Sequence, residues 1–174
     1  CNLNKAKILS IVGTRNATDY GKSICKKLIT DLKKHNHDVL IVSGLAYGID
    51  ITAHEEALKN ELETVAVLGH GLNTIYPAIH KETAAKIIKQ GCLISEFTSQ
   101  AEFNRKNFVR RNRIIAGLAD ATIVVESAPK GGALITADIA NSYNRDVFAF
   151  PGRINDKYSE GTNKLIKQNQ AALI

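Results

Sequence analysis

The chain has 174 residues, of which 44% are hydrophobic and 23% charged, so it is long enough for one globular domain with a sizeable core. It contains no continuous apolar run of 18 residues and no apolar leader with a small-residue cleavage site, so the sequence predicts neither a membrane span nor a signal peptide. The net charge of +6 favours an anionic partner over a cationic one.

Predicted strands alternate with predicted helices along the whole chain. Six short runs rich in Ile and Val are predicted to be strands: 7–12, 38–42, 64–68, 92–95, 121–125 and 146–150. Most are apolar without alternation, as is typical of strands covered on both faces. Helix-like stretches lie between or after them at 20–34, 49–59, 80–89, 108–118 and 134–143, with a last short helix from Thr162. This alternation predicts a single α/β domain with a doubly wound, mostly parallel sheet.

Tight glycine turns follow nearly every predicted strand. They are Gly13-Thr14-Arg15, Ser43-Gly44, Gly69-His70-Gly71, Gly131-Gly132 and Pro151-Gly152. In a parallel sheet these turns meet at one edge, where backbone amides and helix N-termini can bind an anion. Any one turn is explained by an ordinary loop. Five turns at one edge, with Arg15 inside the first, predict an anion site.

The first turn does not match the known nucleotide-binding motifs. Arg15 stands where G-x-G-x-x-G needs its second glycine, and the second strand ends in Ser43 rather than in an acid that could bind ribose. The segment YGKS at 20–23 resembles the end of a P-loop, but Asn16 stands where the first glycine is required. NAD and ATP are therefore disfavoured, and no cofactor is expected.

Catalytic and metal-binding patterns are weak. Ser43, Asp50 and His54 could be drawn as a triad, but the segment lacks a nucleophile elbow, and Asp50 is better explained as a helix N-cap. The five histidines have no metal-ligand spacing, and no metal site is expected. The three cysteines (Cys1, Cys25 and Cys92) are odd in number and form no C-x-x-C pair, which suits a reducing compartment. We therefore expect a cytoplasmic protein that is not an enzyme.

A basic segment at 105–113 contains five cations and no acid: Arg105, Lys106, Arg110, Arg111 and Arg113. A solvated helix face would explain this run of positive charges, and so would a surface at the same sheet edge that binds an extended anion. Arg111 and Arg113, at the predicted helix start, either clamp phosphates or fix neighbouring loops through Asn112. Arg105 and Lys106 are expected to follow the backbone of an extended anion. Phe108 either anchors the helix in the core or stacks on an unpaired base.

Eight motifs occur in order along nearly the whole chain. They are VGTR at 12–15, SGLAYGID at 43–50, LGHGLNTIYP at 68–77, SEF at 95–97, RNRIIAGLAD at 111–120, ALITADIA at 133–140, DVFAFPG at 146–152 and GTNKLI at 161–166. Together they resemble the motifs of the DprA family, also called Smf. This family protects incoming single-stranded DNA and passes it to the RecA recombinase during natural transformation.

The resemblance implies an extended Rossmann domain, a homodimer, no nucleotide cofactor and sequence-independent binding of single-stranded DNA. The chain opens on Cys1 and contains no methionine, so we expect it to be a piece of a longer protein. The resemblance implies that residues 1–174 are the central domain, since family members often carry small helical domains before or after it. The DNA-binding residues expected are Gly13, Arg15, Ser43, Gly44, Arg105, Lys106, Phe108, Arg111, Asn112, Arg113, Gly131 and Gly132. The family's usual Ser-Gly-Ser before the fifth helix is Gly131-Gly132-Ala133 here, which removes hydroxyl contacts but keeps amide donors.

The alternative is a nucleotide-acting enzyme or nucleotide sensor of the related lysine decarboxylase-like group. The motif of that group is similar to P-G-G-x-G-T followed by a catalytic glutamate. In this chain the corresponding turn reads PKGGALIT, and no acid follows it until Asp138. The comparison favours DNA binding.

Overall fold

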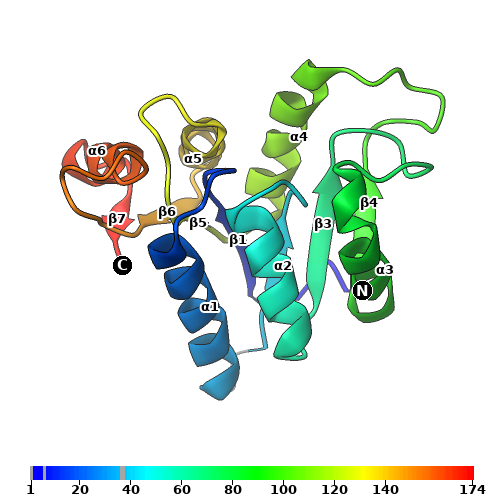
Figure 1. Ribbon diagram of the computed structural model, residues 1–174, viewed down its shortest axis with the longest axis horizontal. Helices are drawn as coiled ribbons and strands as arrows, with labels where there is room; N and C mark the ends of the chain where they lie inside the picture. Colours follow the sequence, from blue (N-terminus) through cyan, green and yellow to red (C-terminus); the bar gives the residue numbers. More distant parts are fainter. Residues whose placement is uncertain (1, 6, 36–37) are drawn as a thin grey trace.

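The computed structural model describes residues 2–5, 7–35 and 38–174, and in this part of the chain seven strands form one sheet (Figure 1). The strands are β1 (Ile8–Val12), β2 (Leu40–Ser43), β3 (Thr64–Leu68), β4 (Cys92–Ser95), β5 (Ala121–Val124), β6 (Asp146–Ala149) and β7 (Ala172–Leu173). Their order is β4-β3-β2-β1-β5-β6-β7, and every neighbouring pair is parallel. The central strands β2, β3 and β5 are buried throughout because helices cover both of their faces.

Helices cover the two faces of the sheet in sequence order. They are α1 (Asp19–Lys34), α2 (Ile49–Lys59), α3 (Lys81–Gln90), α4 (Arg105–Leu118), α5 (Gly132–Ser142) and α6 (Glu160–Lys167), with a short 3-10 helix at Ala78–His80. The first three lie on one face and the last three on the other (Figure 1). The predicted doubly wound Rossmann-like fold is confirmed, and the described sheet is parallel throughout.

Two local predictions were wrong. Helix α4 begins at Arg105 rather than at 108, because the Asn104 side chain accepts a hydrogen bond from the Lys106 backbone amide at 2.9 Å and so caps the helix. Arg105 and Lys106 therefore lie on the first helical turn. Asp50 is not an N-cap, since α2 is preceded by Gly48 and Asp50 lies inside its first turn.

The structure describes only some of the cysteines from which a reducing compartment was expected. Cys25 is a free thiol on the buried face of α1, and burial raises its pKa to about 12. Cys1 lies outside the described residues. Within the described ranges, none of the helices combines the length and the apolar character needed to cross a membrane.

Candidate nucleic-acid interface

A cleft of about 470 Å³ opens at the carboxyl edge of the sheet, between the ends of β1 and β5 and the starts of α4 and α5. We call it the first cleft. The predicted site residues that line it are Gly13, Arg15, Phe108, Arg111, Asn112, Gly131 and Gly132. The other predicted residues, which are Ser43, Gly44, Arg105, Lys106 and Arg113, do not line it.

Arg15 is presented by a turn that the start of α2 and the loop after β5 hold in place. The Thr14 amide donates to the Glu126 carbonyl at 2.7 Å, and the Thr14 carbonyl accepts from the Ile49 amide at 3.2 Å. Gly48, at a positive φ of 76°, packs so closely on this turn that a Cβ would lie 2.2 Å from the Thr14 carbonyl oxygen. The Arg15 side chain is exposed and takes part in none of the ion pairs found among the described residues. It is therefore free to bind an anion.

Arg111 lies at the floor of the first cleft and is almost completely buried. Its Nη1 donates to the Gly44 carbonyl at 2.9 Å and also to the Val67 carbonyl, while its Nε donates to Asn112 Oδ1 at 3.3 Å. Burial lowers the pKa of Arg111 to about 10, and the nearby charge of Asp50 opposes that change. The side chain thus ties the turn after β2 to the end of β3, which is one of the two roles the sequence left open.

The turn after β2 is closed to a ligand. Gly44 is buried beside Arg111 and Asp50, and its amide donates to Asp50 Oδ2 at 3.2 Å. Burial raises the pKa of Asp50, although the Arg111 charge opposes it. The buried Ser43 hydroxyl donates to the Ile11 carbonyl at 2.6 Å.

The residues drawn as a triad do not form one. His54 Nδ1 lies 2.7 Å from Thr64 Oγ1, and the Ser43 hydroxyl is engaged by Ile11. Burial, helped by the Arg111 charge, lowers the pKa of His54 to about 3, so this imidazole is neutral near pH 7. Both side chains have structural partners.

Phe108 belongs to an aromatic cluster made of His70, Tyr76, Phe103 and Phe108. The Phe108 ring centroid lies 5.5 Å from those of Tyr76 and Phe103 and 6.3 Å from that of His70. Phe108 is half-buried and borders the first cleft, whereas Tyr76 is 47% and Phe103 54% exposed. The ring is therefore neither a core anchor nor a free platform: one side packs in the cluster, and the residue also faces the cleft.

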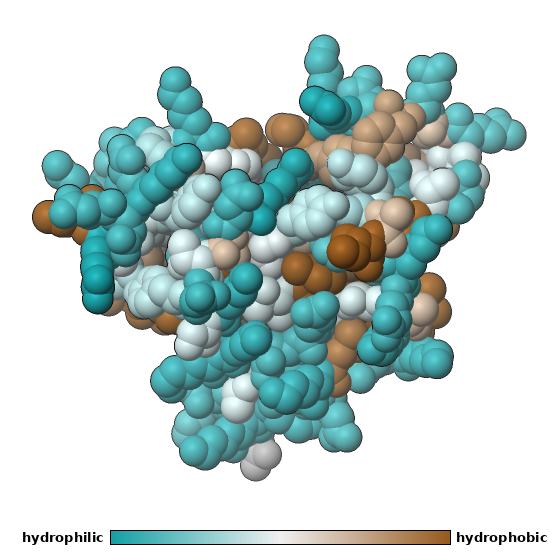
Figure 2. Space-filling model, viewed as in Figure 1, coloured by the Kyte–Doolittle hydropathy of each residue, from teal (hydrophilic) through white to brown (hydrophobic). Residues whose placement is uncertain are grey.

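Sequence reasoning missed Tyr76 and Phe103, although each lies in a loop after a strand end, where ligands bind. Figure 2 shows hydrophobic surface over the part of this face that carries α3 and the loops after β3 and β4, while the part formed by α1 is hydrophilic. Exposed apolar side chains in that region are Leu72, Tyr76, Ile79, Phe103 and Val109.

The cations of the basic segment point in different directions. Arg113 forms an ion pair with Glu96 at 2.5 Å, and Arg110 lies over the Phe97 ring at 5.8 Å from its centroid. Arg105 and Lys106 are exposed on the first turn of α4 and take part in none of the ion pairs among the described side chains. Only part of the segment is therefore available to an anion.

The N-terminus of α5 opens into the first cleft, with Gly131 as the N-cap and Gly132 as the first helical residue. A Cβ on Gly131 would lie 2.3 Å from Ser127 Oγ, whereas a Cβ on Gly132 would meet nothing within 4 Å. Lys157 and Tyr158 line the cleft opposite, on the loop between β6 and α6. No sequence motif indicated these two residues.

The N-terminus of α1, where dinucleotide-binding Rossmann domains hold a pyrophosphate, contains a carboxylate of the protein itself. Glu126 Oε2 accepts from the Thr18 amide at 3.0 Å, and Oε1 accepts from the Thr18 hydroxyl at 2.5 Å. Gly21 leaves the space for this carboxylate, because a Cβ there would lie 2.2 Å from Glu126 Oε2. A ligand anion at this helix end would have to displace Glu126. Within the described ranges no group of three His, Cys, Asp or Glu side chains is arranged to hold a metal ion.

Comparison with known families agrees with these features. The family model of DNA recombination-mediator protein A matches residues 1–174. The chain belongs to this family. Protein Smf of Escherichia coli is 45% identical over 165 residues, and DNA processing protein DprA of Bacillus subtilis is 39% identical over 171.

These matches cover 92% and 98% of this chain, but only 42% and 57% of the two relatives. The chain therefore spans about half the length of the curated relatives it matches.

Solved structures of the family have the same fold. DNA processing protein A of Streptococcus pneumoniae superimposes with a TM-score of 0.89 at 38% identity, covering 99% of this chain and 59% of that one. A structure of DNA processing protein A from Helicobacter pylori, which concerns its single-stranded DNA binding mode, has a TM-score of 0.89 at 32% identity and covers 99% and 77% of the two chains. The molybdenum cofactor carrier protein of Chlamydomonas reinhardtii, at 13% identity and a TM-score of 0.63, shares the fold alone.

Proposed function

We propose that this domain binds single-stranded DNA in the first cleft without sequence preference and acts in DNA recombination. The observation that carries the proposal is the combination, in one open cleft, of the half-buried Phe108 ring with an exposed Arg15 that has no ion-pair partner among the described side chains. A cation that binds phosphate and an aromatic face that can stack on a base are the two parts of a sequence-tolerant single-strand site. Membership of the recombination-mediator family and the DNA-binding relative from Helicobacter pylori support it.

In this proposal the predicted site residues divide into two groups. One group contacts the strand: Arg15, Phe108, Asn112, Gly131 and Gly132. Arg105 and Lys106, on the first turn of α4, attract its backbone. The second group acts indirectly, because its members hold in place the turns that form the cleft: Gly13, Ser43, Gly44 and Arg111. Arg113 is engaged by Glu96 and contributes mainly to the local charge.

The wider role follows from the family and is part of the same proposal. The protein works in the cytoplasm as a homodimer, protects incoming DNA during natural transformation, and transfers it to the RecA recombinase. It carries out no chemical reaction and needs no nucleotide cofactor. A nucleotide-acting enzyme or sensor of the lysine decarboxylase-like group is the alternative that the first experiment must exclude.

The test is the affinity of the Arg15→Ala variant for fluorescent oligo-dT, measured by anisotropy over a range of salt concentrations. Each phosphate contact neutralised on a single strand contributes about 0.7 to the slope of log affinity against log salt concentration. Arg15→Ala should bind more weakly, with a slope that is smaller by about 0.7. The matched control is Arg145→Ala at the amino end of β6, which should bind like the parent. A folded Arg15→Ala with unchanged affinity and slope would contradict the assignment.

A further inference from the structure

A second cleft, of about 870 Å³, lies between the N-terminus of α1 and the loop 150–159 that joins β6 to α6. The lining residues that matter here are Asp19, Tyr20, Arg153, Asp156, Lys157 and Tyr158. The predicted site residues do not include any of these. Because the cleft lies at the carboxyl edge of the same sheet, it is a natural continuation of the first cleft.

The loop that forms one wall of the second cleft is held in place. The Ser127 amide donates to the Tyr158 carbonyl at 2.7 Å, and the Tyr20 hydroxyl donates to the Pro151 carbonyl at 2.7 Å. The Asn163 side chain accepts from the Gly152 amide at 3.1 Å and donates to the Gly152 carbonyl at 3.0 Å. A wall held at both ends is pre-organised for a ligand, so less conformational entropy is lost on binding.

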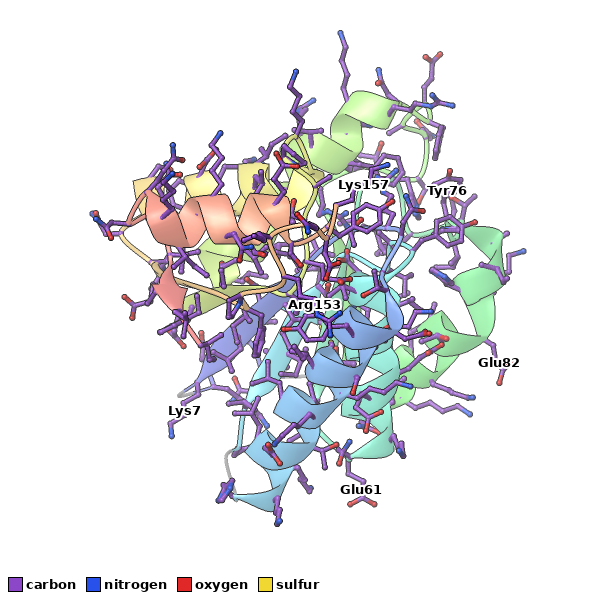
Figure 3. All side chains as sticks on the ribbon, turned by 60° about the vertical axis from the view of Figure 1, so that its left-hand side comes forward. Lys7, Glu61, Tyr76, Glu82, Arg153 and Lys157 are labelled. Carbon is purple, nitrogen blue, oxygen red and sulfur yellow. The ribbon has the colours of Figure 1, made fainter. Side chains whose placement is uncertain are left out.

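The two clefts share a boundary made of Lys157 and Tyr158, which line both of them. Lys157 Nζ lies 5.6 Å from the centroid of the Tyr158 ring. Figure 3 shows Lys157 and Arg153 on the same side of the molecule, above the N-terminal end of α1. Both are exposed and take part in none of the ion pairs formed by the described side chains. A polyanion that leaves the first cleft past Lys157 therefore meets Arg153 next.

The charges in and around the second cleft favour phosphates at its rim rather than in its interior. Glu126 lines the cleft and its carboxylate lies at the N-terminus of α1, where it accepts from the Thr18 amide and hydroxyl, so a second anion there would be repelled by its charge. Asp19 and Asp156 add two more carboxylates to the lining. The rings of Tyr20 and Tyr158 offer flat surfaces on which a base can pack, and the carboxylates can accept hydrogen bonds from base N–H groups.

We propose that the second cleft is a nucleobase subsite for the same DNA strand, with the strand's phosphates on Lys157 and Arg153 and a base turned in between Tyr20 and Tyr158. This inference rests on the proposed function, because it extends the strand bound in the first cleft. It predicts that affinity increases with oligonucleotide length until both clefts are filled.

The experiment compares fluorescent dT oligomers of about 4 and about 12 nucleotides, lengths within the range of single-strand binding sites. Binding is measured with the parent, Arg15→Ala, Arg153→Ala and the opposite-edge control Arg145→Ala. Arg153→Ala should bind the short oligomer like the parent, but should lose most of the affinity gained with length. Its salt slope should be smaller by about 0.7 for the long oligomer only. Arg145→Ala should match the parent with both oligomers.

A second measurement tests the base itself. In a long oligomer, abasic sites replace the bases in one half or the other, so the number of phosphates is unchanged. Because Phe108 in the first cleft can also stack on a base, the parent should bind both of these oligomers more weakly than the intact one, and a half-abasic oligomer that binds as tightly as the intact one would overturn the base subsite. An Arg153→Ala variant that keeps the full increase in affinity with oligonucleotide length would overturn the phosphate contact proposed for Arg153. If the parent binds neither oligomer, or Arg15→Ala binds both normally, the proposed function itself fails.

Discussion

Arg111 and Arg113 lie two residues apart on α4 but in opposite environments. Arg111 is buried and bonded to two carbonyl groups, whereas Arg113 is half-exposed and paired with Glu96. Arg111→Ala should lower the free energy of unfolding by about 3–5 kcal/mol, since it leaves buried carbonyls and the Asp50 charge without their partner. Arg113→Ala, as the control, should change it by less than about 1 kcal/mol. Urea unfolding measures both values, and similar losses for the two variants would contradict the structure.

The Phe108 ring is expected to contribute to stability and to DNA binding together. Because the ring is half-buried, Phe108→Ala should cost less than the ~3–5 kcal/mol of a fully buried phenylalanine. It should weaken oligo-dT binding by about 1–3 kcal/mol, the usual value of one base stacked on an aromatic ring. The control is Phe103→Ala, which removes a ring of the same cluster that does not line the first cleft. If a folded Phe108→Ala binds as tightly as the parent, the ring does not stack on a base and the site binds DNA by electrostatic contacts alone.

The sequence analysis did not separate these two arginines, although the chain carries a signal that distinguishes them. Once α4 begins at Arg105, Asn107, Arg111 and Ile115 follow at intervals of four, and all three are buried on one face. Residues four apart share a helix face, so this signal was present in the chain. It was missed because arginine is rarely buried, and the partners that make its burial possible come from the distant ends of β2 and β3.

At the scale of elements, two glycines in first helical turns are expected to tolerate alanine very differently. A Cβ at Gly21 would lie 2.2 Å from Glu126 Oε2, whereas a Cβ at Gly132 would meet nothing within 4 Å. Gly21→Ala should destabilise the protein because it displaces the carboxylate that accepts from the Thr18 amide and hydroxyl, which cap α1. Gly132→Ala should be neutral or stabilising by up to about 1 kcal/mol, since it restricts the unfolded chain.

Thermal and urea unfolding of the two alanine variants compare them directly. If Gly21→Ala unfolds like the parent, Glu126 does not hold the N-terminus of α1 as described. A strongly destabilised Gly132→Ala would instead mean that the start of α5 is more crowded than the structure shows.

Elements with strong local patterns were predictable, whereas those that depend on distant contacts were not. The predicted ranges of β3, β4 and α2 agree with the structure, since apolar runs and helical periodicity are local signals. The two-residue strand β7 was missed because its only signal is its pairing with β6. The second cleft was missed because residues 18–20 meet 151–158 only in the folded chain.

At the scale of the whole molecule, the parallel sheet brings segments with exposed cations to one edge. Arg15 follows β1, Arg105 and Lys106 follow β4, and Arg153 and Lys157 follow β6. These segments are far apart in sequence but share an edge because every described strand runs the same way. A strand that crosses this edge can meet several of these cations in succession, so we expect a polymer to bind more tightly than a free nucleotide.

This difference predicts how ligands change the melting temperature. Millimolar NAD or ATP should leave it unchanged, because Arg15 stands where a pyrophosphate needs a glycine and Glu126 occupies the N-terminus of α1. Oligo-dT at about 100 times its Kd should add about 2.7 kcal/mol to the free energy of unfolding. For a domain of this size that corresponds to a rise of roughly 5–10 °C. A rise of several degrees with NAD or ATP, and none with oligo-dT, would favour the nucleotide-acting alternative. A parent protein that responds to the polymer alone, beside an Arg15→Ala variant that responds less, would connect the ligand preference to the first cleft.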